Sequence, residues 1–245
     1  MRGLLMTLLV LLCCAGMSMA AERSELQVAI ISFPGYSYLD ETGQPAGKTV
    51  TLSRKLLTEA GYNAQFKILP AARVWQGLKS GEVDVWLGLL NKPDLHEHVL
   101  LTKRDLGQIG INLYHRPDTP SPVWPEGMRG KNIITITNFT YTGPLKQVLI
   151  DPAMDLKMYQ SGSHAGALAM LMRGRGDYLL DYRSQVDPLL RQQGVAALPY
   201  IEVALQPLRF VLSRRTPGVQ QLREDLDAAF DRLHAAGEEL DVTRQ

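Results

Sequence analysis

The chain has very little cysteine, and what it has lies near the beginning. Cys13 and Cys14 are the two cysteines among 245 residues. If the leader described below is removed, the mature chain has no thiol, which excludes disulfides, thiolate metal sites and cysteine nucleophiles. Charge of one sign is also lacking, because the formal net charge is only +1. No basic stripe interleaved with aromatics is present, so we expect no nucleic-acid partner.

Long apolar runs are absent except at the start. Residues 4–15 form a short apolar core behind Arg2, and Ser18-Met19-Ala20 places small residues where signal peptidase reads them. A spanning helix needs about 20 apolar residues, more than this run supplies. We therefore predict that residues 1–20 are a cleavable signal peptide and that the mature protein is periplasmic. Lipid attachment at Cys13 is disfavoured, because Leu12 stands where a small residue is expected.

Residues 69–90 contain a unit that the chain uses twice. Pro70 suits a helix start, Gly81 suits a left-handed helix end, and the apolar residues 83–90 are typical of a strand buried on both faces. Residues 78–84 (LKSGEVD) align on the glycine with residues 171–177 (LMRGRGD). Repetition of helix, glycine, two residues, aspartate and strand predicts two similar α/β lobes with a cleft between them.

Strand and helix patterns alternate along the chain, which predicts mostly parallel sheets flanked by helices. The patterns predict strands at 26–32, 64–69, 83–90, 107–115, 131–137, 156–160, 177–182 and 207–213, and helices at 49–60, from 70, from 144, at 164–173 and at 218–236. The proline-rich residues 116–122 suggest a lobe boundary. We expect residues 21–112 and 208–245 to form the first lobe and 113–207 the second, with the final helix returning to the first lobe through a second crossover.

The order and spacing of these motifs resemble the extracellular solute-binding proteins of family 3, the periplasmic receptors of amino acid ABC importers. The resemblance covers the whole mature chain and rests on the aromatic loop before Tyr38, on Gly43 with Gly47, on Gly130-Lys131 and on the repeated unit with its glycine and aspartate. It implies a two-lobed type II periplasmic-binding fold that closes around a small polar ligand. It also implies an ABC permease as a partner; we expect a monomer without metal or cofactor.

The chain departs from this family where ligand contacts are expected. The family's Thr-x-x-Arg, whose arginine binds the ligand carboxylate, is replaced around Asn91 to His96. The aspartate that would bind a ligand amine is shifted, because Asp181 stands one place early and Tyr182 occupies its position. Arg73 or Arg183 could replace the missing arginine, since a guanidinium binds a carboxylate strongly.

In open α/β sheets ligands bind beyond the carboxyl ends of the strands, and closure requires contacts from both lobes. The residues that we expect to contact the ligand are Phe33, Tyr36, Arg73 and Asn91 from the first lobe and Thr140, Tyr141, Thr142, Asp181, Tyr182 and Arg183 from the second. Alternation along a strand would point Asp181 and Arg183 one way and Tyr182 the other.

Each of these candidates has a structural alternative. Phe33 and Tyr36 could only pack the lobes together, the threonines could cap a helix, and Arg73 could pair with a surface acid. Asp181 and Arg183 could pair with each other or with helix ends. Asp94, His96 and His98 alternate like metal ligands, but a solvated turn is favoured. Asp84 and Asp177 are interpreted as turn caps.

Three function classes compete for this sequence. The first is a receptor that delivers an amino acid or related compound to an ABC importer. The second is a ligand sensor or delivery protein without a dedicated permease. The third is an enzyme similar to cyclohexadienyl dehydratase, which would need an acid of raised pKa in the cleft, where Asp181 is the candidate. We expect binding rather than catalysis.

The leader generates the first testable prediction. Periplasmic protein should begin at Ala21 or close to it, because the small residues before it form the cleavage site. Mass analysis of the intact exported protein measures this directly. A mature chain that still begins at Met1 would contradict the prediction.

Overall fold

The computed structural model describes residues 25–33, 35–89, 92–137, 139, 141 and 143–244. The predicted leader, residues 1–20, lies outside the described residues. Within them, no helix combines the length and the apolar character needed to cross a membrane.

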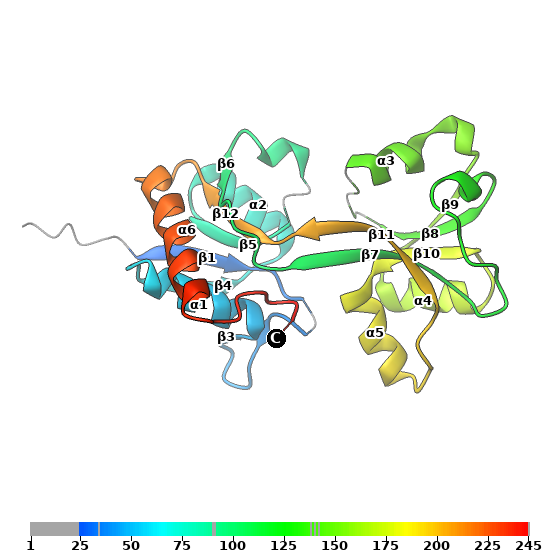
Figure 1. Ribbon diagram of the computed structural model, residues 1–245, viewed down its shortest axis with the longest axis horizontal. Helices are drawn as coiled ribbons and strands as arrows, with labels where there is room; N and C mark the ends of the chain where they lie inside the picture. The colour runs from blue at the N-terminus through cyan, green and yellow to red at the C-terminus, as the bar shows by residue number, and fades with distance from the viewer. Residues whose placement is uncertain are drawn as a thin grey trace, which may run out of the picture.

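Two five-stranded sheets form separate lobes that lie side by side (Figure 1). The first sheet has the order β4-β1-β5-β12-β6 and the second β11-β7-β10-β8-β9. The strands of the first sheet are β1 (Leu26–Ile30), β4 (Ala64–Ile68), β5 (Val85–Gly88), β6 (Val99–Leu101) and β12 (Arg209–Ser213). Those of the second are β7 (Gln108–His115), β8 (Asn132–Ile136), β9 (Lys157–Ser161), β10 (Tyr178–Tyr182) and β11 (Tyr200–Pro207). A small hairpin adds β2 (Tyr38–Leu39) and β3 (Pro45–Ala46).

Each sheet combines a parallel trio with two antiparallel pairings. In the first sheet β4, β1 and β5 are parallel, and β12 runs antiparallel between β5 and β6. In the second, β10, β8 and β9 are parallel, and β7 is antiparallel to both β10 and β11. The chain therefore leaves the first sheet before β7 and returns to it with β12. The two-lobed α/β fold with two crossovers is confirmed.

Helices cover both faces of each sheet. Their bounds are α1 (Lys48–Glu59), α2 (Ala71–Ser80), α3 (Gly143–Ile150), α4 (His164–Met172), α5 (Arg183–Gln192) and α6 (Val219–Ala235), with short 3-10 turns at Pro93–Leu95, Glu126–Met128 and Pro152–Met154. In the first lobe α1 and α6 share one apolar cluster, and α2 packs on the opposite face. In the second, α4 and α5 cover one face and α3 the other (Figure 1).

The repeated aspartate has the same structural role in both lobes. The Asp84 Oδ2 accepts from the Gln27 N–H at 2.8 Å, and the Asp84 N–H donates to the Gln27 carbonyl at 2.9 Å. In the second lobe the Asp177 Oδ2 accepts from the Asn132 N–H at 2.8 Å, and the Asp177 N–H donates to the Asn132 carbonyl at 2.9 Å. Each carboxylate thus joins the starts of two parallel strands instead of capping its own turn, so the role of both residues is structural, as expected, but differs from a turn cap.

The glycines of the repeat end their helices as predicted. Gly81 and Gly174 have φ values of 87° and 69°. Both lie in the left-handed region, where a side chain would be strained and glycine is not. The chain can therefore turn directly from each helix into the next strand.

Several features differ from the sequence-based expectations. The helix α5 and the strands β6 and β11 were not predicted: Pro188 lies inside α5, β6 has only three residues, and β11 is a half-exposed strand at the sheet edge. Residues 108–112, which we assigned to the first lobe, belong to β7 and hydrogen-bond within the second sheet. In Figure 1 β7 and β11 run together between the lobes, so the precise lobe boundaries stay a prediction.

The aspartate contacts generate a prediction about stability. Asp84→Ala and Asp177→Ala each leave a backbone N–H without its acceptor, which should lower the free energy of unfolding by about 1–3 kcal/mol. Asp118→Ala is the control, because the Asp118 side chain is 77% exposed and pairs with Arg116 at the surface. Urea denaturation measures all three. If both repeat variants unfold at the same urea concentration as the control variant, the structural role is refuted.

Candidate functional site

Tyr36 lies where the two lobes meet. It follows the carboxyl end of β1 and packs against the core cluster of the first lobe. It also packs against the second-lobe cluster that contains Tyr182, at the carboxyl end of β10. Burial raises the pKa of Tyr36, the positive charge of Arg183 opposes that rise, and Asp241 adds to it. The carboxyl ends of the two sheets therefore face each other, at the position where the sequence predicts a ligand site.

The loop that carries Tyr36 is closed by backbone hydrogen bonds. The N–H groups of Phe33 and Ser37 each donate to the carbonyl of the other residue at 2.9 Å. The rings of Phe33 and Tyr36 are 5.5 Å apart, centroid to centroid, and tilted by 54°. A side chain at Gly47 would place its Cβ 2.4 Å from the Tyr36 carbonyl oxygen. Gly47 is therefore needed for the loop to approach the start of α1.

In the second lobe Asp181 is buried against His164. The Nδ1 of His164, the first residue of α4, lies 2.9 Å and 2.8 Å from the two carboxylate oxygens. Asp181 Oδ1 also accepts from the Tyr182 N–H at 2.7 Å. The side chain of Asp181 is 0% exposed and that of His164 23%. Burial raises the pKa of Asp181, and the hydrogen bond and charge of His164 oppose the rise. His164 is therefore partly accessible to solvent, whereas the Asp181 side chain is covered.

Aromatic rings surround this contact. Phe139 meets the imidazole of His164 edge-on at 5.4 Å and the ring of Tyr182 at 5.3 Å. The Tyr141 hydroxyl donates to the Leu180 carbonyl at 3.4 Å, and burial raises the pKa of Tyr141. Phe139 thus connects His164 to Tyr182, the residue whose cluster contacts Tyr36.

The structure separates three neighbouring residues that we predicted together. Tyr182 belongs to the cluster on the α3 face, whereas Asp181 contacts α4 on the opposite face, as alternation requires. Arg183 departs from the alternation, because it begins α5 instead of continuing the strand. It does not pair with Asp181; a hydrogen bond with Tyr200 raises its pKa.

The remaining predicted residues are less constrained. Arg73 is exposed on α2, and its side chain has no hydrogen bond or ion pair with the residues that the structure describes. Asn91, Thr140 and Thr142 lie outside the described residues. The site that we define comprises the described residues around this junction: Phe33, Tyr36, Phe139, Tyr141, His164, Asp181, Tyr182 and Arg183. Arg73, near the start of α2, stays a predicted ligand contact.

The sequence analysis missed His164 and Phe139. The signal for His164 was Ser163, whose side chain accepts from the Gly166 N–H at 3.1 Å and caps the start of α4. A helix that follows β9 begins at the carboxyl edge of the parallel trio, beside the end of β10. The predicted order of strands and helices could therefore have placed His164 next to Asp181, although no local sequence motif indicates the pair.

The alternating segment at residues 94–98 does not gather as metal ligands do. Asp94 pairs with Lys79 at 2.6 Å, and this hydrogen bond lowers the pKa of Asp94. Within the described part of the chain, no three side chains of histidine, cysteine, aspartate or glutamate come together to hold a metal ion.

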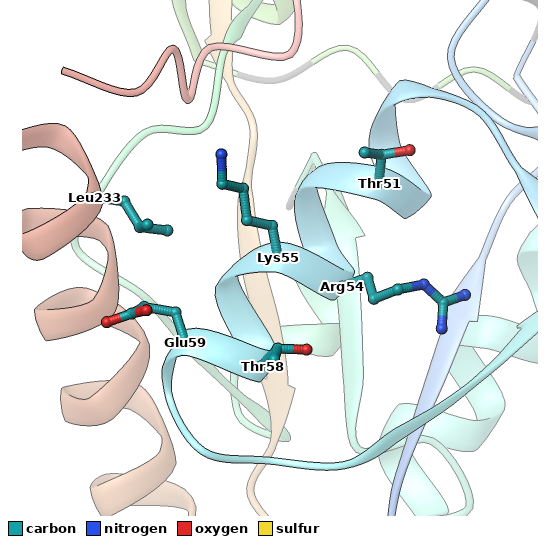
Figure 2. Close-up of a pocket in the computed structure, with 6 residues that line it drawn as sticks. All are labelled: Thr51, Arg54, Lys55, Thr58, Glu59 and Leu233. Carbon is teal, nitrogen blue, oxygen red and sulfur yellow. The ribbon is translucent and has the colours of Figure 1, made fainter. Parts of the chain in front are cut away.

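A cavity of about 500 Å³ lies on the first lobe alone, between α1 and α6 (Figure 2). Its lining residues are Thr51, Arg54, Lys55, Thr58, Glu59 and Leu233. Lys55 pairs with Glu238 at 2.6 Å, and Glu59 pairs with Arg232 at 2.7 Å. The guanidinium of Arg54 lies 4.6 Å from the centroid of the Phe66 ring. Because these charges are already partnered, we assign no ligand to this cavity.

Comparison with known proteins identifies a family. The model of the family described as "Bacterial extracellular solute-binding proteins, family 3" matches residues 26–243. A search of curated proteins finds no match.

Solved structures share the fold over nearly the whole chain. A histidine kinase sensor domain similar to periplasmic binding proteins has a TM-score of 0.69 and 21% identity, covering 91% of this chain and 95% of that one. An ancestral arginine-binding protein bound to arginine has a TM-score of 0.66 and 18% identity, covering 91% and 97%. A putative L-cystine ABC transporter from Listeria monocytogenes has 0.64 and 20%, covering 88% and 92%. At these identities the likeness shows the fold alone.

The buried carboxyl group generates a prediction about pH. Because folding raises the pKa of Asp181 above its usual 3.8, the folded chain binds the proton more tightly than the unfolded chain. Stability from this group is therefore lost as pH rises from below 3.8 through the raised pKa. Thermal melts from about pH 4 to about pH 7 should show Asp181→Asn gaining stability relative to the parent as pH rises. Parallel curves for the two proteins would contradict this prediction.

Proposed function

This chain belongs to family 3 of the bacterial extracellular solute-binding proteins, and from that premise we propose that it captures a small polar ligand between its lobes for an ABC importer. An amino acid or a related compound fits this proposal best. The observation that carries it is the junction at Tyr36, where the carboxyl ends of both sheets converge and packing reaches both cores.

The connections between the lobes suit a hinge. Two antiparallel strands, β7 and β11, run together from the first lobe into the second sheet (Figure 1). Leu208, directly after β11, packs against clusters of both lobes. Hinge closure is a usual motion of periplasmic receptors. A ligand drives closure only if it binds the closed state better than the open state. The ligand should therefore contact residues of both lobes.

The charges around the junction favour an acidic group on the ligand. The ammonium of Lys48 lies 6.0 Å from the centroid of the Tyr36 ring. Arg183 acts electrostatically on Tyr36 from the second lobe, and Arg73 is exposed on α2. We propose that Arg73 supplies a first-lobe contact to a ligand carboxylate. Asp181 is 0% exposed, which argues against its use as a catalytic acid, so binding is proposed rather than catalysis.

The setting that we propose is the periplasm, reached through the predicted signal peptide, with the protein acting as a monomer that docks on permease subunits. A sensor role is the second candidate, because a histidine kinase sensor domain shares the fold. Affinity purification from crosslinked cells separates the two roles. Recovery of an ABC permease supports import, and recovery of a signalling receptor without a permease supports sensing.

Native mass spectrometry tests ligand capture itself. Protein purified without denaturation should carry an additional small mass that is lost when the chain unfolds. A thermal-shift screen of common amino acids and organic acids then identifies compounds that raise the melting temperature. A bare chain that no compound of the screen stabilises would overturn the proposal.

Arg73 provides a prediction about affinity. Arg73→Ala should weaken binding of the most stabilising compound by several-fold or more, because hydrogen bonds to charged groups contribute about 1.5–3 kcal/mol. Arg104→Ala is the control, since Arg104 pairs with Asp231 on the outer surface of the first lobe at 2.7 Å. Calorimetry measures both. Unchanged affinity in a folded Arg73→Ala variant would remove Arg73 from the site.

A further inference from the structure

His164 is held by a carboxylate that a ligand cannot reach. Both oxygens of Asp181 lie within 2.9 Å of Nδ1, and the carboxylate is fully covered. An ionised carboxylate only accepts hydrogen bonds, so Nδ1 must donate. The ring is therefore fixed in orientation by one nitrogen. Nε2 has no hydrogen-bond partner among the residues that the structure describes.

The ring is also placed to meet a ligand. His164 keeps 23% of its side chain exposed, and Phe139 packs between it and Tyr182. The cluster that contains Tyr182 also contacts Tyr36 of the first lobe. His164 thus stands beside the carboxyl end of β10, at the edge that faces the first lobe.

The charge of Asp181 affects whether the Nε2 atom of His164 can donate a hydrogen bond. Among the described residues, His164 is the basic side chain that contacts this buried carboxylate. A buried negative charge is costly unless a positive charge is paired with it, and the imidazolium form of His164 would supply that charge. Both nitrogens of an imidazolium are donors. Nε2–H therefore suits an acceptor on the ligand and repels an ammonium group.

We propose that His164 determines ligand specificity by donating its Nε2–H to a carboxylate of the ligand, while Asp181 acts as a positioning residue through Nδ1. The inference rests on the proposed function, because it assumes that a ligand binds between the lobes. It also narrows the ligand class, since an acid should bind much better than the matched amine that lacks the carboxylate.

The test uses probes in matched sets. L-Glutamate is compared with glutarate, which lacks the amino group, and with 4-aminobutyrate, which lacks the α-carboxylate; L-arginine is compared with agmatine, its decarboxylated form. The remaining common amino acids complete the panel. Calorimetry at about pH 6 measures affinity, and a second series at about pH 8 measures its pH dependence, since these values bracket the usual pKa of histidine.

Two variants separate the roles of the ring nitrogens. In His164→Asn the side-chain amide replaces Nδ1 against Asp181, so the fold is kept while the outer donor is lost. His234→Asn is the control, because His234 stacks on Phe230 of α6 in the first lobe. In Asp181→Asn the imidazole keeps an acceptor at Nδ1 but loses the negative charge that would pair with an imidazolium. This variant tests the positioning role if His164→Asn does not fold.

We expect at least one carboxylate probe to bind the parent and the His234→Asn variant with equal affinity. The same probe should bind His164→Asn at least tenfold more weakly. Parent affinity should be lower at about pH 8 than at about pH 6, because the proposed donor carries the proton and the anion and the proton bind together. The profile should be flat in His164→Asn and weaker in slope in Asp181→Asn. Besides Asp181, the elements packed against α4 carry these titratable groups: Lys157, Tyr159, Tyr178, Tyr182, Arg183, Asp187 and Arg191.

Two outcomes overturn the inference while leaving the proposed function intact. One is a carboxylate probe that binds His164→Asn and the parent equally at both pH values. The other is agmatine binding as tightly as L-arginine. Absence of binding by every carboxylate of the panel also overturns it. The proposed function is then rejected as well only if the native preparation carries no small molecule.

Discussion

The rest of the structure depends on one carboxylate at the amino edge of each sheet. Asp84 and Asp177 each bond the backbone at the start of a neighbouring parallel strand, and so they fix where β5 pairs with β1 and β10 with β8. Once the register is fixed, the opposite edge of each sheet holds the carboxyl ends. That edge carries Tyr36 in one lobe and Tyr182 in the other, which pack in one cluster. Local backbone hydrogen bonds thus place the candidate site.

Most of the fold could be predicted because periodicity and helix ends are local signals. The helix that ends at Gly81 and the apolar stripe of α6 were both visible in the sequence. The helix α5 was missed because Pro188 interrupts its pattern, and β11 because an edge strand needs no continuous apolar run. Where β7 belongs depends on long-range pairing with β10 and β11, which no local pattern contains.

The sequence predicted the sheet edges at which the site lies, but not most of the side-chain contacts within it. Tyr36 lies at the junction, as its position after the first strand suggested. The contact of Asp181 with His164 was not predicted. His164 and Asp181 are 17 residues apart in sequence and meet only because α4 begins over the end of β10. This contact changes which group is accessible at the site, because the Asp181 carboxylate is covered and the imidazole of His164 is partly exposed instead. The family relationship supports ligand capture, and we propose that the residues at the junction determine which ligand is captured.

The most direct test of interlobe ligand capture is a distance measured between spin labels on the two lobes. The described chain contains no cysteine, so Gln76→Cys on α2 and Lys146→Cys on α3 can be labelled selectively. Both positions are exposed, and α2 and α3 stand on facing lobes in Figure 1. With the compound recovered from the native preparation, the account predicts a shorter and narrower distance distribution than without it. An identical distribution in both samples, with the compound bound, would contradict the account.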